Sequence, residues 1–231
     1  GIVNDMANQA VPFVHTINLA SPLWQNAANL THPRMQTMLT LLPDGQVLAL
    51  GGTRCAGTNE VKFNIMNEDP GSPPCDPGQV LTPELWNPSN GNWTQMANHQ
   101  ETRVYHSTSI LLPDARVLVA GSGLPLAGGE TGNGLFCYGE MNRNDFRCRN
   151  NGHKTAEIFE PPYLFEPDGA GARPALRPAI ITAPEGLTYG QQFSIEVGNV
   201  SASDISKVVL IRLPSVTHGF DQDQRRVELA P

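Results

Sequence analysis

The sequence feature that most constrains the fold is a hairpin pattern that occurs twice, 70 residues apart. Each copy is an apolar run, a turn built on Pro-Asp, a second apolar run and two small residues. The first copy is LLPDGQVLALGG from Leu41, and the second is LLPDARVLVAGS from Leu111. A Pro-Asp turn between two runs rich in β-forming residues predicts a β-hairpin, so the chain is expected to contain the same hairpin twice.

A second element follows each hairpin after a long loop. The segment Pro83–Pro88 is matched by Ala156–Pro161, and His15–Leu19 stands before Trp24 as Glu84–Trp86 stands before Trp93. Helical periodicity is nearly absent, and sets of strands that repeat over several tens of residues are typical of propeller blades. The sequence therefore predicts one outer strand and about two blades, with Trp24, Trp86 and Trp93 in the blade core. The alternative is an ordinary β-sandwich that contains two similar hairpins.

The pattern changes at Arg173–Pro178. Alternating stretches at 193–197 and 207–212 predict strands of a separate sandwich. The expected fold class is all-β, with a partial kelch-type β-propeller in residues 1–172 and an immunoglobulin-like β-sandwich in residues 173–231. Both parts are expected to be incomplete, because propellers have about 4–8 blades and such sandwiches have about 100 residues.

Charge and hydropathy exclude two classes of partner. The formal net charge is −7 and 16% of the residues are charged, which gives no basic face for nucleic-acid phosphates. No run of about 18 apolar residues occurs, so no membrane span is expected.

Two short motifs carry candidate metal ligands. Tyr105 and His106 come directly before the second hairpin, where the first copy has Met35 and Gln36, so the blade itself does not require them. His218 lies in a loop between predicted sandwich strands. Imidazole nitrogen and phenolate oxygen form a reasonable ligand set for copper(II). The alternative for each histidine is a buried, hydrogen-bonded side chain with no metal.

The motifs taken together resemble the galactose oxidase/glyoxal oxidase family. The resemblance rests on RVYHS from Arg103, AEIFEPPYL from Ala156, LIR from Leu210, and the segment from Thr217 to Arg226. These motifs occur in the family's order between roughly Ser21 and Leu229. The resemblance implies a kelch-type propeller followed by an early-set domain, one loop of which brings a histidine to a mononuclear copper.

The resemblance also implies roles for individual residues. Tyr105 matches the axial tyrosine, which takes the hydroxyl proton of the substrate, while His106 and His218 match copper-binding histidines. The family oxidises primary alcohols, aldehydes or carbohydrate substrates with O2 and releases H2O2. Its second redox group, a tyrosine crosslinked to a cysteine, belongs to earlier blades, and no residue of this chain matches it. We expect the segment from Asp221 to Arg226 to hold the loop that carries His218.

Two functional hypotheses follow. In the first, the chain is the C-terminal part of a secreted, extracellular or periplasmic copper-radical oxidase, with further blades supplied by other sequence or by another chain. In the second, it is a non-catalytic propeller and early-set module that binds carbohydrate or protein in an extracellular assembly. No signal peptide is recognisable at Gly1, so the chain is expected to be mature or trimmed. The sequons at Asn29, Asn92 and Asn199 are compatible with secretion.

The four cysteines predict two disulfide bonds. Cys55, Cys75, Cys137 and Cys148 form two sequential pairs in loops, and the lack of a CxxC motif disfavours a zinc or thioredoxin-type site. We expect the bonds Cys55–Cys75 and Cys137–Cys148, which imply an oxidising compartment. Peptide mapping without reduction should recover both linked pairs. Four free thiols would contradict both the pairing and the extracellular assignment.

Overall fold

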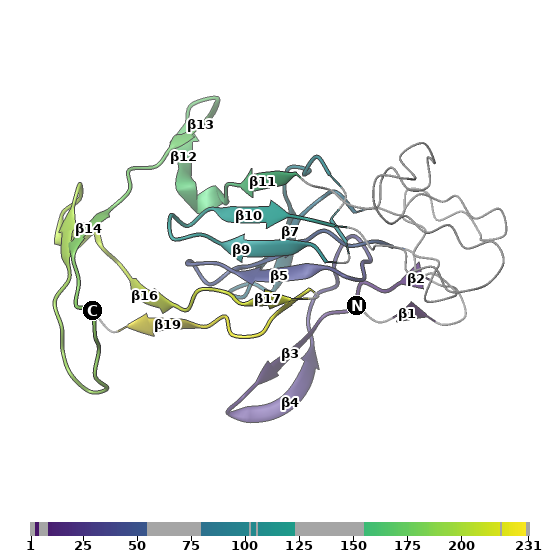
Figure 1. Ribbon diagram of the computed structural model, residues 1–231, viewed down its shortest axis with the longest axis horizontal. Coiled ribbons are helices and arrows are strands. Elements are labelled where there is room, and N and C mark those ends of the chain that lie inside the picture. Colours follow the sequence, from purple (N-terminus) through teal and green to yellow (C-terminus); the bar gives the residue numbers. More distant parts are fainter. Residues whose placement is uncertain are drawn as a thin grey trace, which may run out of the picture. The chain divides into compact units, whose positions relative to one another are not determined.

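The computed structural model is all-β, and its described residues include two short 3-10 helices, η2 (Pro162–Leu164) and η3 (Ala202–Asp204). It describes residues 3–4, 9–54, 80–101, 103–104, 106–122, 155–217 and 219–229, and the four cysteines lie outside these ranges. The chain forms two compact units (Figure 1). Unit 1 comprises Gly1–Phe159 and Arg212–Arg225, and unit 2 comprises Glu160–Ile211 and Arg226–Pro231. The assignment of domains to residues 1–172 and 173–231 stays a prediction.

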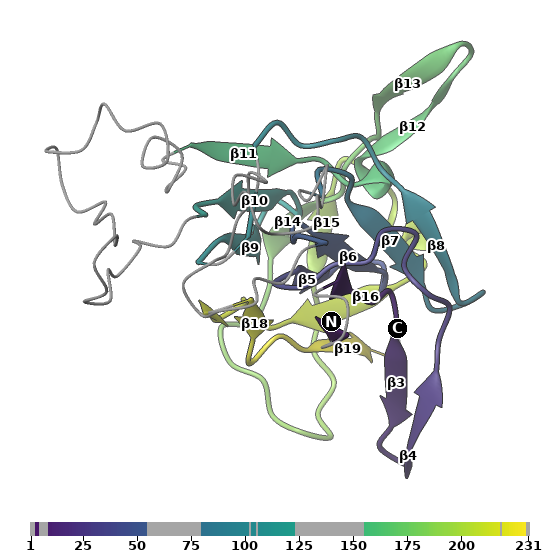
Figure 2. The same ribbon diagram turned by 90° about the vertical axis from the view of Figure 1, so that its right-hand side faces the viewer.

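The first copy of the repeat forms a four-stranded antiparallel sheet (Figure 2). At its turn, the Gly45 N–H donates to the Leu42 carbonyl over 2.9 Å, and Gly45 has a φ of 91°, which a glycine adopts without strain. Buried side chains such as Leu48 and Leu50 form its core. The strands in sheet order are β5 (Met38–Leu41), β6 (Val47–Leu50), β7 (Glu84–Asn87) and β8 (Asn92–Gln95).

The second copy forms a three-stranded sheet of the same design, which confirms the predicted hairpins. Ala115 stands where the first copy has Gly45 and takes the same left-handed backbone, with a φ of 66°. The two sheets are blades of a partial β-propeller, and the innermost strands β5 and β9 contact each other. Between them, the buried hydroxyls of Thr40 and Ser109 lie 2.6 Å apart. The second sheet contains β9 (Thr108–Leu111), β10 (Val117–Ala120) and β11 (Ala156–Phe159).

A hairpin precedes the first blade, where the sequence predicts one outer strand. Strands β3 (His15–Asn18) and β4 (Ser21–Asn26) pair so that Ile17 is opposite Trp24, just as Trp86 is opposite Trp93 in β7 and β8. The expectation that Trp24 is a core residue is wrong, because 68% of its surface is exposed. In the described part of the chain, β3 and β4 pair only with each other. A further short pair, β1 (Val3–Asn4) with β2 (Gln9–Ala10), lies at the start of the chain.

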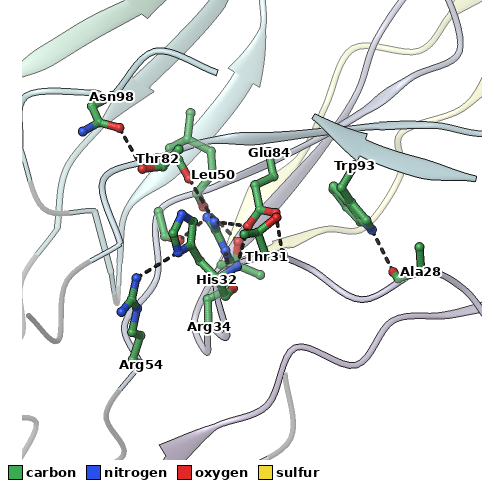
Figure 3. Close-up of polar contacts among 12 residues, drawn as sticks. Ala28, Thr31, His32, Arg34, Leu50, Arg54, Thr82, Glu84, Trp93 and Asn98 are labelled. Atoms are coloured by element: carbon green, nitrogen blue, oxygen red, sulfur yellow. Dashed lines mark hydrogen bonds and ion pairs between the residues drawn. The ribbon is translucent and has the colours of Figure 1, made fainter. Parts of the chain in front are cut away.

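A buried ion pair joins the first blade to the segment that enters it. Arg34 Nη2 lies 2.7 Å from Glu84 Oε1, and both side chains are fully buried (Figure 3). The guanidinium also donates to the carbonyls of Gly51 and Thr82 over 3.0 and 2.9 Å. One side chain therefore fixes the entry segment, the end of β6 and the start of β7.

The carboxylate of Glu84 is equally well satisfied. It accepts the backbone N–H groups of Thr31 and His32 over 2.7 and 3.1 Å. Burial acts to raise the pKa of Glu84, but these two donors and the charge of Arg34 outweigh it, so the pKa lies below its usual value. Glu84 is therefore ionised at neutral pH, as a buried partner of an arginine needs to be.

The second blade repeats this ion pair. Arg103 Nη2 lies 2.8 Å from Glu157 Oε1, and Arg103 Nη1 donates to the carbonyls of Gly121 and Thr155 over 2.8 and 3.0 Å. The Gln100 N–H donates to Glu157, in the position that the Thr31 N–H has in the first blade. Burial favours a higher pKa for Glu157, but the Gln100 N–H and Arg103 lower it overall.

Unit 2 contains three antiparallel strand pairs and both short helices. The predicted strand at 207–212 is present as β16, whereas that at 193–197 is only partly a strand, since β15 starts at Glu196. Among the described residues, the buried alanine, valine, leucine and methionine side chains all belong to unit 1, whereas unit 2 buries Pro161. The pairs are β12 (Phe165–Asp168) with β13 (Gly171–Pro174), β14 (Ala179–Thr182) with β15 (Glu196–Gly198), and β16 (Val208–Ile211) with β19 (Arg226–Leu229).

One core position differs between the repeats in a way that makes stability depend on pH. The His99 N–H donates to Leu81, as the Leu30 N–H donates to Pro12 in the preceding repeat. Both side chains are buried, and no described residue partners His99 Nε2. Burial lowers the pKa of His99, and the nearby positive charge of Arg103 acts in the same direction.

We predict that the protein loses stability as the pH falls below about 6.5, the ordinary histidine pKa. Below that value the unfolded chain binds a proton that folded His99 refuses, which costs up to about 1.4 kcal/mol per pH unit until the folded pKa is reached. Denaturant unfolding between pH 7.5 and 5 measures this slope. His99→Leu, which copies Leu30, should reduce the slope; an unchanged slope would show that His99 is not its source. His32, whose pKa burial also lowers, should account for part of the remainder.

Candidate metal centre

His106 lies at the entrance to the innermost strand of the second blade. Its side chain is exposed, and its backbone is left-handed, with a φ of 60°. The Ser107 N–H donates to the Val104 carbonyl over 3.0 Å, which closes a turn immediately before β9. Gln36 has the same left-handed backbone in the first blade, with a φ of 58°. The position is therefore part of the repeat, and only its side chain differs.

The second copy contains one extra residue at this turn. Arg34 and Arg103 occupy equivalent places by their ion pairs, but Gln36 follows Arg34 by two residues whereas His106 follows Arg103 by three. The extra residue thus falls between the buried arginine and the left-handed residue. This is the stretch that holds Tyr105.

A hairpin from the C-terminal part of the chain packs against the same inner strands. Strands β17 (Val216–Thr217) and β18 (Phe220–Asp221) flank residues 218 and 219. Strand β17 contacts β9, and β18 contacts β5. Although the hairpin is inserted between β16 and β19 in sequence, it belongs to unit 1 by its contacts.

Gln224 holds this hairpin to β5. Its side-chain oxygen accepts the Leu41 N–H over 2.6 Å, and its side-chain nitrogen donates to the Leu41 carbonyl over 2.8 Å. In the β5–β6 hairpin, the Leu42 N–H donates to the Gln46 carbonyl. Residues that bond to the partner strand alternate along an antiparallel strand with residues that do not. The polar groups of Leu41 therefore point to the open edge of β5, and one glutamine amide satisfies both.

Other contacts stiffen the loop, in agreement with the structural role expected for the segment from Asp221 to Arg226. Asp223 forms ion pairs with Arg212 and Arg225 at 2.7 and 3.0 Å. The Ser215 N–H donates to Asp221 Oδ1 over 3.2 Å. The two ends of the loop are thus fastened to each other.

The hairpin reaches the end of the blades at which His106 lies. The Gly52 N–H donates to the Arg103 carbonyl over 2.7 Å, so the entrances to β5 and β9 are at the same end. A Cβ on Gly219 would lie 3.3 Å from the carbonyl oxygen of Thr37, the residue before β5. Gly219, the residue after His218, is therefore at this end too.

The predicted ligand set stays a prediction. His106 is in place at the blade entrance, whereas Tyr105 and His218 lie outside the described residues. Within the described ranges, no three His, Cys, Asp or Glu side chains are grouped so that they could hold a metal ion. No helix among these ranges is long and apolar enough to cross a membrane.

Sequence reasoning missed the two buried arginines, and within the segment from Asp221 to Arg226 it did not single out Gln224 as the residue that holds the loop to β5. The arginines had a signal, because each stands shortly before a repeated hairpin and Glu84 and Glu157 align between the copies. Gln224 had none, since a glutamine that bonds to the backbone of a distant strand has no characteristic neighbours in sequence.

Comparison with known proteins shows similarity to galactose oxidases and aldehyde oxidases. Residues 177–231 match the family described as galactose oxidase-like, early set domain. The chain is 33% identical to a galactose oxidase of Gibberella zeae over 190 residues, which are 82% of this chain and 22% of that protein. It is 30% identical to the aldehyde oxidase GLOX of Vitis pseudoreticulata over 212 residues, or 90% of this chain and 34% of that protein.

A solved structure gives the same result. A fungal alcohol oxidase of the AA5 family, determined in complex with copper, superposes with a TM-score of 0.70 at 28% identity. The match covers 96% of this chain and 39% of the solved one. The chain thus spans between about a fifth and two fifths of the length of these relatives. It is a relative of the galactose oxidase and glyoxal oxidase family, whose early set domain it contains at residues 177–231.

Proposed function

We propose that this chain is the copper-binding C-terminal part of a secreted copper-radical oxidase with a kelch-type propeller. The observation that carries the proposal is the docking of the β17–β18 hairpin against β5 and β9, at the end of the blades from which His106 leads into β9. In the proposal Tyr105, His106 and His218 hold one copper ion. Two imidazoles and a phenolate suit copper(II), and the exposed ring of His106 is not taken up in the blade core.

The protein groups have distinct tasks in this proposal. His106 and His218 orient the centre from two parts of the chain, and the Tyr105 phenolate oxygen accepts the hydroxyl proton of a primary alcohol or hydrated aldehyde. Bound copper would supply a one-electron couple. Since conversion of an alcohol and O2 into an aldehyde and H2O2 transfers two electrons, a second redox group is needed. We propose that further blades, from other sequence or another chain, provide it.

The exposed outer hairpin supports the proposal of further blades. Leu19, Leu23 and Trp24 are exposed on β3 and β4 or their turn, and β3 is the equivalent of β7, which lies between two strands in the first blade. A strand edge of this kind pairs readily with another strand.

The second candidate is a non-catalytic module that binds carbohydrate or protein outside the cell. The sequence favours it in one respect, because no tyrosine and cysteine of this chain match the radical pair, and all four cysteines are expected in local disulfides. The two candidates differ in copper binding, which only the oxidase proposal requires.

Copper titration is the direct test of the proposed function. We expect the protein to bind one copper(II) ion with a tetragonal electron paramagnetic resonance (EPR) spectrum. His106→Ala and His218→Ala should each weaken binding by more than about 100-fold, beyond the effect of losing an outer hydrogen-bond partner. Gln36→Ala, at the matching left-handed position of the first blade, should leave binding unchanged. Wild-type protein that binds no copper would favour the non-catalytic module.

Docking through Gln224 should contribute to copper affinity. Gln224→Ala removes both bonds to Leu41 and frees the hairpin, so we expect about 10- to 100-fold weaker copper binding, as for other groups that orient ligands. Gln222→Ala, at an exposed position of the same loop, is the matched control. Equal affinities of the two variants would show that this contact does not position the hairpin.

A further inference from the structure

The two buried arginines form the same ion pair but support different turns. Arg34 leads into the turn with Met35 and Gln36, whereas Arg103 leads into the longer turn with Tyr105 and His106. The ion pair is common to both blades, so a difference between the turns has to come from the residues next to it.

The peptide of Gly121 connects Arg103 to His106. Its carbonyl accepts a hydrogen bond from Arg103 Nη1 over 2.8 Å. On its other side, a Cβ on Gly121 would lie 3.0 Å from the His106 carbonyl oxygen, so the two backbones are in close contact. A movement of the guanidinium would shift Gly121 and, with it, the backbone on which His106 stands.

A side-chain hydrogen bond that the first copy cannot form stabilises the longer second turn. The Val104 N–H donates to Ser122 Oγ over 3.1 Å, and Ser122 is buried. The matching residue in the first copy is Gly52, which has no side chain. Ser122 thus satisfies a backbone donor in the turn that contains the additional residue.

We propose that Arg103, paired with Glu157, and Ser122 are positioning residues that fix the Tyr105–His106 turn for metal binding. This inference rests on the proposed function, because positioning has a purpose only if His106 is a ligand. Neither residue is placed in contact with metal or substrate. Both act through backbone, Arg103 through Gly121 and Ser122 through Val104.

The repeat supplies a matched experiment on the whole protein. Arg103→Lys and Arg34→Lys make the same change in two equivalent ion pairs, and lysine cannot reproduce the fork of an arginine. Thermal unfolding should show a comparable loss of stability in both variants. Copper affinity should fall about 10- to 100-fold in Arg103→Lys, with altered copper hyperfine splitting in its EPR spectrum, and clearly less in Arg34→Lys, which reaches the turn less directly, through Gly51 and the Arg103 carbonyl.

Ser122→Gly, which installs the residue of the first copy, provides a milder variant should the lysine variants not fold. It should weaken copper binding at least severalfold while the wild-type ion pair is retained. Copper binding that is unchanged in Arg103→Lys, or equally weakened in Arg34→Lys, would overturn the role of Arg103. Unchanged binding in Ser122→Gly would overturn that of Ser122. Wild-type protein without copper affinity would instead remove the proposed function and this inference together.

Discussion

The blade architecture depends on an ion pair between a fully buried arginine and a glutamate, which occurs once in each of the two blades. Burying two charges is costly unless each is paired and its remaining hydrogen-bonding groups are satisfied. Arg34 and Glu84 meet this requirement through backbone groups of three separate segments. Arg103 and Glu157 are paired in the same way one blade further, although no described residue partners Arg103 Nε and the Glu157 side chain is 21% exposed. Removal of one partner of such a pair costs about 3–5 kcal/mol. The sheets and their entry segments are therefore held in one arrangement.

The two blades share one design, and a small difference in sequence changes the entry turn of the second. The blades share their hairpin, their ion pair and a left-handed residue before the innermost strand. The second blade adds one residue to the entry turn and replaces Gln36 by His106 at the left-handed position. The β17–β18 hairpin lies at the same end of the blades and is held to β5 by Gln224, so two segments far apart in the sequence meet at the end where the second copy differs from the first.

Much of this fold could be predicted from the sequence because its signals are local. The Pro-Asp turns at Pro43 and Pro113 specify the hairpins, and the matching segments Pro83–Pro88 and Ala156–Pro161 specify the strand that follows each hairpin. Contacts between distant segments could not be predicted in this way. Nothing near Arg34 in sequence indicates that Glu84 is its partner, and nothing near Gln224 indicates Leu41. The exposure of Trp24 was also mispredicted, since a strand position in a repeat does not reveal what packs on it.

The central claim, that histidines from two distant segments share one copper ion, is tested most directly by pulsed EPR spectroscopy of the copper-loaded protein. Modulation from the remote imidazole nitrogen reports the number of histidines bound to copper(II). The account predicts two coordinated imidazoles in the wild-type protein and one in His218→Ala. A single imidazole in the wild-type protein, or the same number in both proteins, would contradict it.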